Sequence, residues 1–378
     1  MRVLHLYSNY KWTGPSEPVV NLACALRDDG VDVRLACCRT PKPRPRSVGD
    51  KAAERGLEPI LDFRLTKLIS LNGMRDIGRM STYLEDHAID IVHTHRPRDH
   101  GIGAYAAHRC RRHVKVVRTN HTGVALEHSW LQRLVFRRYT DAYVGFSRLA
   151  ADQDQQYFGL PKDRIFLINP ALDLERFDPS RDYPDIRPQL SLSSDHVLVG
   201  IIARAQRHRR WEVLLAAMKL AVERAPKLRL LIVGKGTHFD TMVRQPVKDM
   251  GLNDCVLLPG YRTNDDYVAY LNNLDFKIFL MPGTDGTCRA AREAMAMGKP
   301  VIAARRGMLP ELVAHEDTGL IIDDTPEQLA GAMVWLANDA NLRKRLGEGA
   351  RRYALDHFRL KDQSKAVIAM YEQLMRSE

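Results

Sequence analysis

Short apolar runs alternate with amphipathic stretches along the whole chain. Runs such as 3–7, 197–202 and 301–304 have the length and composition of buried strands, and stretches such as 19–26 and 77–84 have the spacing of helices between them. Strands that alternate with helices form parallel sheets covered on both faces. The chain is therefore expected to be an α/β protein. The expected strands are 3–7, 33–37, 89–92, 114–117, 143–146, 165–168, 197–202, 230–233, 256–258, 276–281, 301–304 and 320–322.

The chain length and one polar segment predict two domains. At 378 residues the chain is too long for one typical hydrophobic core. Residues 178–195 are polar, rich in Pro and Ser, and without periodicity, which is typical of a linker. The predicted domains are residues 1–177 and 196–358, each with its own strand–helix alternation.

The composition favours a globular protein of a reducing compartment. Apolar residues make up 45% and charged residues 27% of the chain, and no run of about 18 apolar residues exists. The first residues enter a strand directly and lack the long apolar core of a signal peptide. The six cysteines show no CxxC spacing and no disulfide framework. A cytoplasmic location is expected.

Basic residues are concentrated in one part of the first half. Residues 101–150 hold nine Lys and Arg against Glu127 and Asp141, a local excess of seven within a net charge of +11. Such a patch suits an anionic partner, for example the inner face of the plasma membrane, where the protein would be peripheral. A basic but solvated surface is the alternative.

The segment 276–313 has the pattern of a strand–helix–strand unit with an anion site. An apolar run ends at Pro282, a loop with Asp285, Gly286, Thr287 and Cys288 follows, and a helix begins near residue 289. The first N–H groups of a helix are unpaired and attract anions such as a phosphate. Further residues of the same motif follow in this unit: Glu293, Ala294, Met295, Ala296, Gly298, Pro300, Val301, Gly307, Pro310 and Glu311.

These motifs resemble the signature of glycosyltransferase family 4, retaining enzymes of the GT-B fold. The resemblance implies two Rossmann-like, doubly wound domains that face each other across a cleft, with the C-terminal helix 359–378 joined to the first domain. It implies a metal-independent, hexosyltransferase-type enzyme without a cofactor. Such an enzyme moves a sugar from a UDP- or GDP-sugar to a hydroxyl acceptor, here expected to be a cell-envelope glycan, lipid or lipid-linked oligosaccharide.

The resemblance also assigns residues of the second domain. Arg204 and Arg209, in the loop after the strand 197–202, correspond to the family's two cationic residues on the diphosphate; a guanidinium binds phosphate with two donors. Lys235 and Gly236 lie in a turn near the nucleotide, as does Arg262. For the glycine, a purely structural turn is the alternative.

The loop and helix of the 276–313 unit carry the sugar and ribose contacts that the family implies. Asp285 takes the place of a Glu that contacts the donor sugar, and Gly286, Thr287 and Cys288 offer their backbone N–H groups. Asp285 or Thr287 acting only as a helix cap is the alternative. Glu293 is expected to bind ribose hydroxyls; its alternative is a surface ion pair with Arg289.

In the first domain, histidines follow two expected strands. His121 matches the family's histidine beside the donor sugar, and Gly14 lies where the family has paired glycines near the substrates. His93 and His95 share one face of a strand, but no carboxylate or Cys completes a zinc site, so no metal is expected. Asp152 and Asp154 copy a metal-binding pair of another transferase fold, although their helical setting favours a solvated helix face.

The sequence thus predicts an enzyme in which His121, Asp285, Arg204 and Arg209 act on the reacting groups. A catalytically weak GT-B-like scaffold that binds a nucleotide or a glycan is the alternative. No nucleic-acid motif is found, so no nucleic-acid partner is expected. The sequence does not indicate an oligomeric state.

Overall fold

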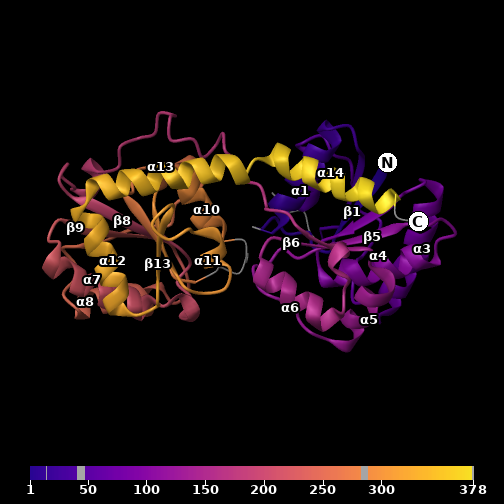
Figure 1. Cartoon of the computed structure of the whole chain (residues 1–378), viewed down its shortest axis with the longest axis horizontal. Coiled ribbons are helices and arrows are strands. Elements are labelled where there is room, and N and C mark those ends of the chain that lie inside the picture. The colour runs from indigo at the N-terminus through magenta and orange to yellow at the C-terminus, as the bar shows by residue number, and fades with distance from the viewer. Residues whose placement is uncertain (14, 41–46, 282–287, 377–378) are drawn as a thin grey trace. The chain divides into compact units, whose positions relative to one another are not determined.

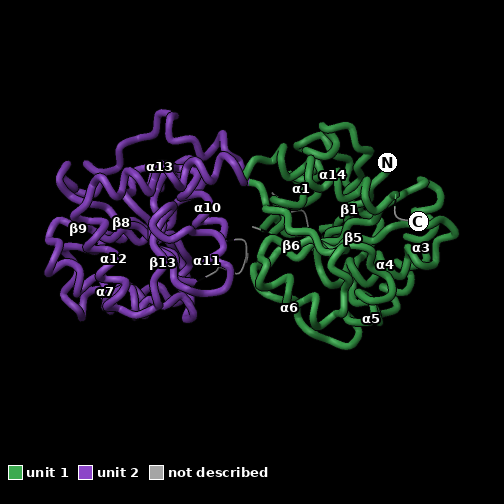
Figure 2. The backbone as a smooth tube through the Cα atoms, in the orientation of Figure 1, with its two compact units in different colours: residues 1–171, 284–287, 358–378 green, residues 172–283, 288–357 purple. Residues whose placement is uncertain are grey.

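The computed structural model describes residues 1–13, 15–40, 47–281 and 288–376. The chain forms two compact units, which are coloured separately in Figure 2. The first contains the chain up to Ala171 together with the C-terminal segment from Phe358, and the second runs from Leu172 to His357. Among the described residues, no helix combines the length and the apolar character that a membrane crossing requires.

The first unit is built on a seven-stranded parallel sheet in the order β3-β2-β1-β4-β5-β6-β7. Its strands are β1 (Arg2–Tyr7), β2 (Asp32–Cys37), β3 (Pro59–Ile60), β4 (Ile91–Thr94), β5 (Lys115–Thr119), β6 (Ala142–Gly145) and β7 (Ile165–Leu167). The strand order reverses between β1 and β4. In open parallel sheets, ligands bind beyond the carboxyl ends of the strands at such a switch point.

Seven helices described in the first unit cover the two faces of this sheet (Figure 1). They are α1 (Ser16–Asp28), α2 (Val48–Ala53), α3 (Leu71–Asp86), α4 (Pro97–Arg109), α5 (Trp130–Tyr139), α6 (Arg148–Phe158) and α14 (Leu360–Arg376). Several begin at a serine whose hydroxyl accepts an N–H of the first turn, as Ser70 and Ser147 do. The helix α6 ends at Gly159, which adopts φ 69°.

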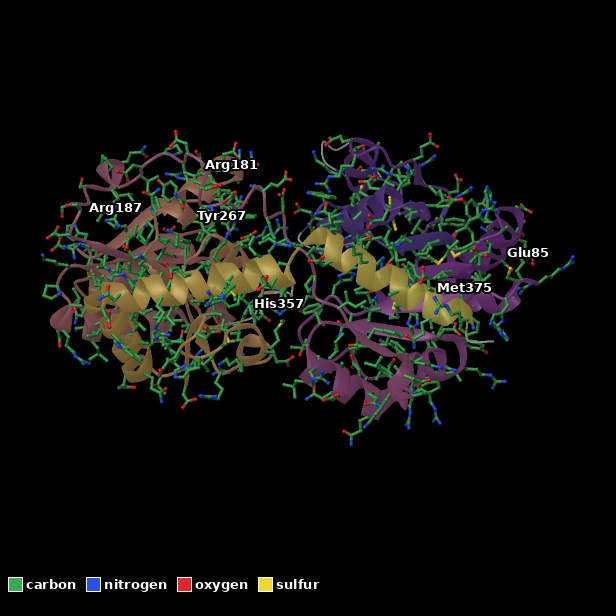
Figure 3. The ribbon with its side chains drawn as sticks, turned by 45° about the horizontal axis from the view of Figure 1, so that its top comes forward. Glu85, Arg181, Arg187, Tyr267, His357 and Met375 are labelled. Atoms are coloured by element: carbon green, nitrogen blue, oxygen red, sulfur yellow. The ribbon has the colours of Figure 1, made fainter. Side chains whose placement is uncertain are left out.

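Alternate residues of β1 serve two separate cores. Leu4 and Leu6 pack in a cluster with residues of α3 and α4, whereas Val3 packs on the other face with Val367 and Tyr371 of α14. The helix α14 lies beside α1 (Figure 1), and Met375, near its end, is labelled in Figure 3. The last helix of the chain therefore belongs to the core of the first unit.

The second unit is built on a six-stranded parallel sheet in the order β10-β9-β8-β11-β12-β13. Its strands are β8 (Val197–Ile202), β9 (Leu228–Val233), β10 (Val256–Gly260), β11 (Phe276–Phe279), β12 (Val301–Ala304) and β13 (Gly319–Ile322). Its helices are α7 (Trp211–Arg224), α8 (Gln245–Asp249), α9 (Asn264–Asn272), α10 (Arg289–Ala296), α11 (Leu309–Leu312), α12 (Pro326–Asn338) and α13 (Ala340–His357). The order reverses between β8 and β11, so this sheet has its own switch point.

The fold is the predicted one: two α/β units, each with a parallel sheet between helices. The segment 178–195, predicted as a linker, is instead packed on the second unit. Ile186 is buried, and Arg187 (labelled in Figure 3) donates from Nη2 to Asp275 Oδ2 at 3.0 Å and from Nη1 to the carbonyl of His196 at 2.9 Å. The connection is polar because it lies at the surface, yet it is held in place by hydrogen bonds.

Candidate active site

Four histidines gather where β1, β4 and β5 end in the first unit. His5 lies on β1 and His93 on β4, and the two are register partners. His95 follows β4, and His121 follows β5. His93 and His95 stack with their ring centroids 4.5 Å apart, so the prediction that they share a face is confirmed. His5, His93 and His95 are buried, whereas His121 is half-buried.

Hydrogen bonds join these rings into one chain. His95 Nδ1 lies 2.8 Å from His121 Nε2, and His95 Nε2 lies 3.0 Å from His5 Nδ1. The Tyr371 hydroxyl of α14 lies 3.4 Å from His5 Nε2 and 2.5 Å from His93 Nδ1. At the far end, His93 Nε2 is 2.6 Å from the Thr119 hydroxyl. His121 is therefore positioned from inside the unit, and its other ring nitrogen, Nδ1, has no hydrogen-bond partner among the residues that the structure describes.

Burial keeps these rings neutral. Loss of hydration lowers the pKa of His5 and of His121 to about 3, and lowers the pKa of His95 well below its usual value. The nearby Arg118 guanidinium lowers the pKa of His121 further, and burial lowers the pKa of Arg118 itself to about 10. Neutral imidazoles act as hydrogen-bond donors and acceptors at the same time, so these rings can orient a polar group of a ligand.

Three of the rings also form a group that could hold a metal ion. Nitrogen atoms of His5, His93 and His95 lie within 4.8 Å of one another. From the sequence only His93 and His95 were recognised as a pair, because His5 stands in an apolar run on another strand. In the structure these nitrogens already pair with one another, with Tyr371 and with Thr119.

Buried carboxylates hold the backbone around the histidines. Asp99 of α4 accepts the N–H of Ser8 at 2.9 Å and the N–H groups of His95 and Arg96 at 3.3 and 2.7 Å. Burial raises the pKa of Asp99 to about 6. Asp99 thereby ties the segment after β1 to the segment after β4. No sequence pattern indicates this role of Asp99.

The segment after His121 depends on Asp154 of α6. This carboxylate accepts the Tyr143 hydroxyl at 2.7 Å, the N–H of Leu126 at 2.8 Å and the side-chain amide of Asn120 at 3.3 Å. The prediction of a solvated helix face is wrong for Asp154, which is fully buried, because α6 packs its inner face over this segment. Asp152, two residues earlier, is exposed as predicted.

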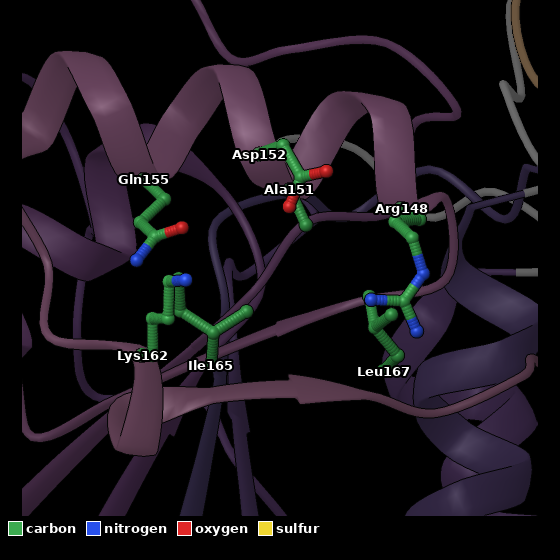
Figure 4. A pocket seen from close by; sticks show the side chains of 7 residues that line it. All are labelled: Arg148, Ala151, Asp152, Gln155, Lys162, Ile165 and Leu167. Carbon is green, nitrogen blue, oxygen red and sulfur yellow. The ribbon is translucent and has the colours of Figure 1, made fainter.

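Asp152 lines a surface hollow between α6 and β7 (Figure 4). The hollow has a volume of about 540 Å³, and Arg148, Gln155 and Lys162 also face it. Its lining carries charges of both signs. The hollow therefore does not indicate one class of ligand.

In the second unit, the two predicted arginines of the loop after β8 differ in their exposure to solvent. Arg204 is exposed at the end of the strand, whereas Arg209 is half-buried and donates from Nη1 to the carbonyl of Met281 at 3.4 Å. Met281 directly precedes the segment 282–287. The next residue, Arg210, has φ 59° and pairs with Asp324 at 2.8 Å, which fixes the end of the loop.

The backbone of the turn after β9 is in direct contact with the backbone of the loop after β8. The N–H of Ala205 donates to the carbonyl of Lys235 at 3.1 Å. A Cβ on Gly234 would lie 2.0 Å from the carbonyl oxygen of Ala203, and one on Gly236 would lie 2.8 Å from that of Ala205. Close packing against the Ala205 carbonyl therefore explains why position 236 is a glycine. The predicted contact of Gly236 with a nucleotide stays a prediction.

Two cations flank the predicted nucleotide side of the second unit. The Lys235 ammonium lies 3.6 Å from the centre of the Tyr261 ring and is exposed. Arg262 donates to the Tyr270 hydroxyl at 3.2 Å and is half-buried. Both side chains lie beyond the carboxyl ends of their strands, where a ligand of this sheet would bind.

Glu293 is held by two partners inside the second unit. One carboxylate oxygen accepts Arg289 Nε at 2.8 Å, and the other accepts the Tyr267 hydroxyl. The pair with Arg289 was foreseen as an alternative, but on the surface, whereas the side chain of Glu293 is buried. Tyr267, labelled in Figure 3, was missed because it comes from another helix, α9.

The start of α10 is only partly described. Cys288 is buried with φ 51°, and its carbonyl accepts the N–H of Ala291 at 2.9 Å. The remaining predicted residues Gly14, Asp285, Gly286 and Thr287 lie outside the described residues. Their roles stay predictions.

Comparisons with known proteins agree with this architecture. A family model described as Glycosyltransferase Family 4 matches residues 13–176, and one described as Glycosyl transferases group 1 matches residues 182–353. N-acetyl-alpha-D-glucosaminyl L-malate synthase of Bacillus anthracis is 28% identical over 304 residues, which cover 78% of this chain and 76% of the synthase.

Two further proteins are similar over most of their length. D-inositol 3-phosphate glycosyltransferase of Streptomyces bingchenggensis is 26% identical over 310 residues, covering 76% of this chain and 67% of that enzyme. The crystal structure of Anabaena HepE in complex with UDP has a TM-score of 0.81 and 18% identity, and covers 99% of this chain and all of that one. The last similarity concerns the fold.

Proposed function

We propose that this chain, a glycosyltransferase that belongs to family 4 and to the glycosyl transferases group 1, uses a nucleoside diphosphate sugar as its donor. The transfer to a hydroxyl acceptor would retain the configuration of the sugar and require no metal ion. The basic loop after β8 is the observation that carries the proposal: Arg204 is exposed, and Arg209 reaches the end of β11. UDP is the first nucleotide to test, since UDP is bound in the similar HepE structure.

The chemistry that this loop supports is stabilisation of a departing diphosphate. Negative charge develops on the diphosphate as the bond to the sugar breaks, and preformed cations lower the free energy of that transition state. Arg204 and Arg209 supply the charge, with backbone N–H groups of residues 286–288 and the side chain of Asp285 as further proposed contacts. In the first unit, His121 is proposed to donate a hydrogen bond to the reacting sugar or to its leaving oxygen.

The remaining proposed contacts concern the nucleoside. Glu293 would hold the ribose hydroxyls through a carboxylate that Arg289 and Tyr267 keep in place. Lys235 and Arg262 would lie toward the base and phosphates. The leaving phosphate itself would take the proton of the acceptor hydroxyl, since no described residue stands out as a nucleophile.

Turnover with a panel of UDP- and GDP-sugars tests the donor proposal. Arg204→Ala and Arg209→Ala are expected to lower kcat/KM by roughly a hundredfold or more, as loss of a charge-stabilising donor does. Arg207→Ala is the matched control, because Arg207 is exposed in the same loop. Unchanged turnover in both variants would refute the diphosphate role. Binding of a sugar nucleotide without transfer or hydrolysis would support the scaffold alternative.

The acceptor is proposed to be an anionic component of the cell envelope, such as a glycan, a lipid or a lipid-linked oligosaccharide. The names of two similar enzymes contain compounds that carry negative charge, L-malate and inositol 3-phosphate. The first unit of this chain is basic in residues 101–150. Mass-spectrometric detection of a hexose added to an anionic envelope fraction, and not to its neutral fraction, would support this class of acceptor.

The helix α5 offers a surface for an anionic membrane. Its outer face exposes Trp130 and Leu134, 74% and 38% accessible, beside Arg133, Arg137 and Arg138. Apolar and basic side chains on one helix face suit the interface of an anionic bilayer. Arg118, counted with the basic patch, is buried and contributes nothing to this surface.

Sedimentation with liposomes tests the membrane proposal. The protein is expected to bind vesicles rich in phosphatidylglycerol at low salt and to leave them at high salt. Trp130→Ala together with Arg137→Glu should abolish binding, while Trp335→Ala, which removes an exposed Trp of the second unit, should not. Equal binding to neutral vesicles, or none at low salt, would contradict it.

A further inference from the structure

Six side chains form a continuous hydrogen-bonded chain through the interior of the first unit. We name this chain the histidine network. In order, its members are Thr119, His93, Tyr371, His5, His95 and His121, joined at 2.6, 2.5, 3.4, 3.0 and 2.8 Å. Five of the six are buried, and only His121, at one end, is half-buried. The network starts at Thr119 of β5, passes through Tyr371 of α14, and ends at the predicted sugar-binding side chain.

We propose that the histidine network fixes His121 in the tautomer that carries its hydrogen on Nδ1, so that His121 presents an N–H donor to its ligand. Thr119, His93, Tyr371, His5 and His95 are then positioning residues. The proposal rests on the proposed function only in placing a ligand at His121. The tautomer itself is a property of the free protein.

The number of hydrogens in the network limits the directions that its hydrogen bonds can take. Each neutral imidazole has one N–H, and each hydroxyl has one O–H, so the six groups carry six hydrogens for five hydrogen bonds. Every bond needs one hydrogen, because neither two N–H groups nor two lone pairs can face each other at these distances. An imidazole between two partners must therefore donate on one side and accept on the other. The Tyr371 hydroxyl could accept from both His93 and His5, but its own O–H would then be a buried donor without an acceptor among the described residues, which is unfavourable. All five bonds therefore run in the same direction. The sixth hydrogen is left at one end.

The extra hydrogen can lie at either end of the network. In one direction it lies on the Thr119 hydroxyl, in the other on His121 Nδ1. The Thr119 side chain is buried, and among the residues that the structure describes its hydroxyl has no partner besides His93. An O–H left there would be a buried donor without an acceptor, which is unfavourable. His121 Nδ1 lies at the half-buried end, where water or a ligand can accept its hydrogen.

Burial disfavours charged forms of the network. Burial lowers the pKa of His5, His93, His95 and His121, and raises the pKa of the Tyr371 phenol well above its usual value. At neutral pH the network thus contains neither an imidazolium nor a phenolate. The count of one hydrogen per group holds.

This direction makes one prediction for all four rings. His93 donates from Nδ1 to Tyr371, which donates to His5; His5 and His95 each donate from Nδ1 to the next ring. All four histidines must therefore carry their hydrogen on Nδ1. The opposite direction would place all four hydrogens on Nε2, so the two directions have no ring state in common. A donor N–H on His121 suits an oxygen that gains negative charge, as the leaving oxygen of a donor sugar does.

Nitrogen-15 NMR of the full-length, histidine-labelled protein at pH 7 tests the inference directly, because long-range correlations distinguish the protonated from the unprotonated ring nitrogen. The expected result is Nδ1–H for His5, His93, His95 and His121 without any ligand. Any of the four found as Nε2–H, or charged, would overturn the proposal. Bound zinc in the purified protein, with spectra that change on chelation, would also overturn it, since the metal would occupy the lone pairs that the network uses.

A variant pair tests the consequence for the reaction. His95→Phe removes the partner of His121 Nε2 while keeping an aromatic ring, and is expected to give mixed His121 tautomers and to lower kcat roughly tenfold or more, with the donor KM little changed. His100→Phe is the matched control: His100 is buried and bonded to Thr140 at 2.9 Å, outside the network. If His95→Phe kept a single His121 tautomer and full kcat, the positioning role would be refuted. If no sugar nucleotide is turned over, the NMR result still decides the proposal.

Discussion

The buried Lys277 gives a prediction whose size follows from the structure. This lysine lies on β11, is fully buried, and its Nζ atom has no hydrogen-bond partner among the described residues. Burial lowers its pKa from 10.5 to about 8, although the Glu293 carboxylate acts in the opposite direction. A buried ammonium without hydrogen bonds destabilises the folded state, so Lys277→Met, which keeps the length of the side chain, is expected to stabilise the second unit.

The magnitude comes from the difference between the two pKa values. A folded-state pKa below the unfolded value means that unfolding takes up a proton, so stability is lowest well below pH 8 and rises between pH 8 and 10.5. The shift corresponds to about 3 kcal/mol at 1.36 kcal/mol for each pKa unit. For a unit of this size, that is a rise in Tm of about 6–12 °C.

Scanning calorimetry at pH 7.5 and pH 9.5 measures both parts of the prediction. Lys277→Met should raise the Tm of the second unit at pH 7.5, and its advantage should shrink by about half at pH 9.5, where the wild-type lysine is neutral in the folded state but still mostly charged in the unfolded state. Lys248→Met, at an exposed position of α8, is the control and should change little. A Tm that falls, or an advantage that does not depend on pH, would refute the reasoning.

Three further predictions concern stability. Asp154→Ala leaves the Tyr143 hydroxyl and the Leu126 N–H without their acceptor and should destabilise the first unit by roughly 2–5 kcal/mol in calorimetry. The control Asp152→Ala, at an exposed position of the same helix, should destabilise it by less than about 0.5 kcal/mol. Equal effects of the two substitutions would contradict the anchoring role of Asp154. Gly234→Ala places a Cβ 2.0 Å from a backbone oxygen and should lower the Tm of the second unit, whereas Gly331→Ala, with open space around it in α12, should not. Acid is expected to destabilise the first unit, because the folded-state pKa values of five histidines lie below 6.5 and unfolding therefore takes up protons; they are His5, His93, His95, His100 and His121. Each ring lowers the free energy of unfolding by up to about 1.4 kcal/mol for each pH unit below 6.5. A Tm of the first unit that is constant from pH 7.5 to 5.5 would disprove this.

The sequence predicts the sheets well because their strands are buried on both faces. The expected runs 197–202 and 301–304 have the bounds of β8 and β12, and the other runs differ from their strands by a few residues at either end. The strand β3 was missed because it has only two residues and no apolar run of its own. Apolar periodicity thus identifies strands that fill a core, and misses a short edge strand that packing places.

The site residues also differ in whether the sequence alone could identify them. Arg209 and His121 were picked because the family resemblance assigns them, and both follow a strand, at the edge to which a parallel sheet brings its carboxyl ends. His5 and Tyr371 could not, because a single polar residue within an apolar run carries no signal until strand pairing and helix packing bring it to its partners. Asp154 was misread for the same reason: only the packing of α6 shows which of its faces is buried.

The proposed function depends on binding of the donor diphosphate by the basic loop after β8. Titration calorimetry of UDP with the wild type and with Arg204→Ala, Arg209→Ala and the control Arg207→Ala measures this binding. The first two variants are expected to bind UDP about 10- to 100-fold more weakly, because each loses a charged hydrogen bond, and the control is expected to bind like the wild type. Wild-type affinity in both Arg204→Ala and Arg209→Ala would contradict the claim.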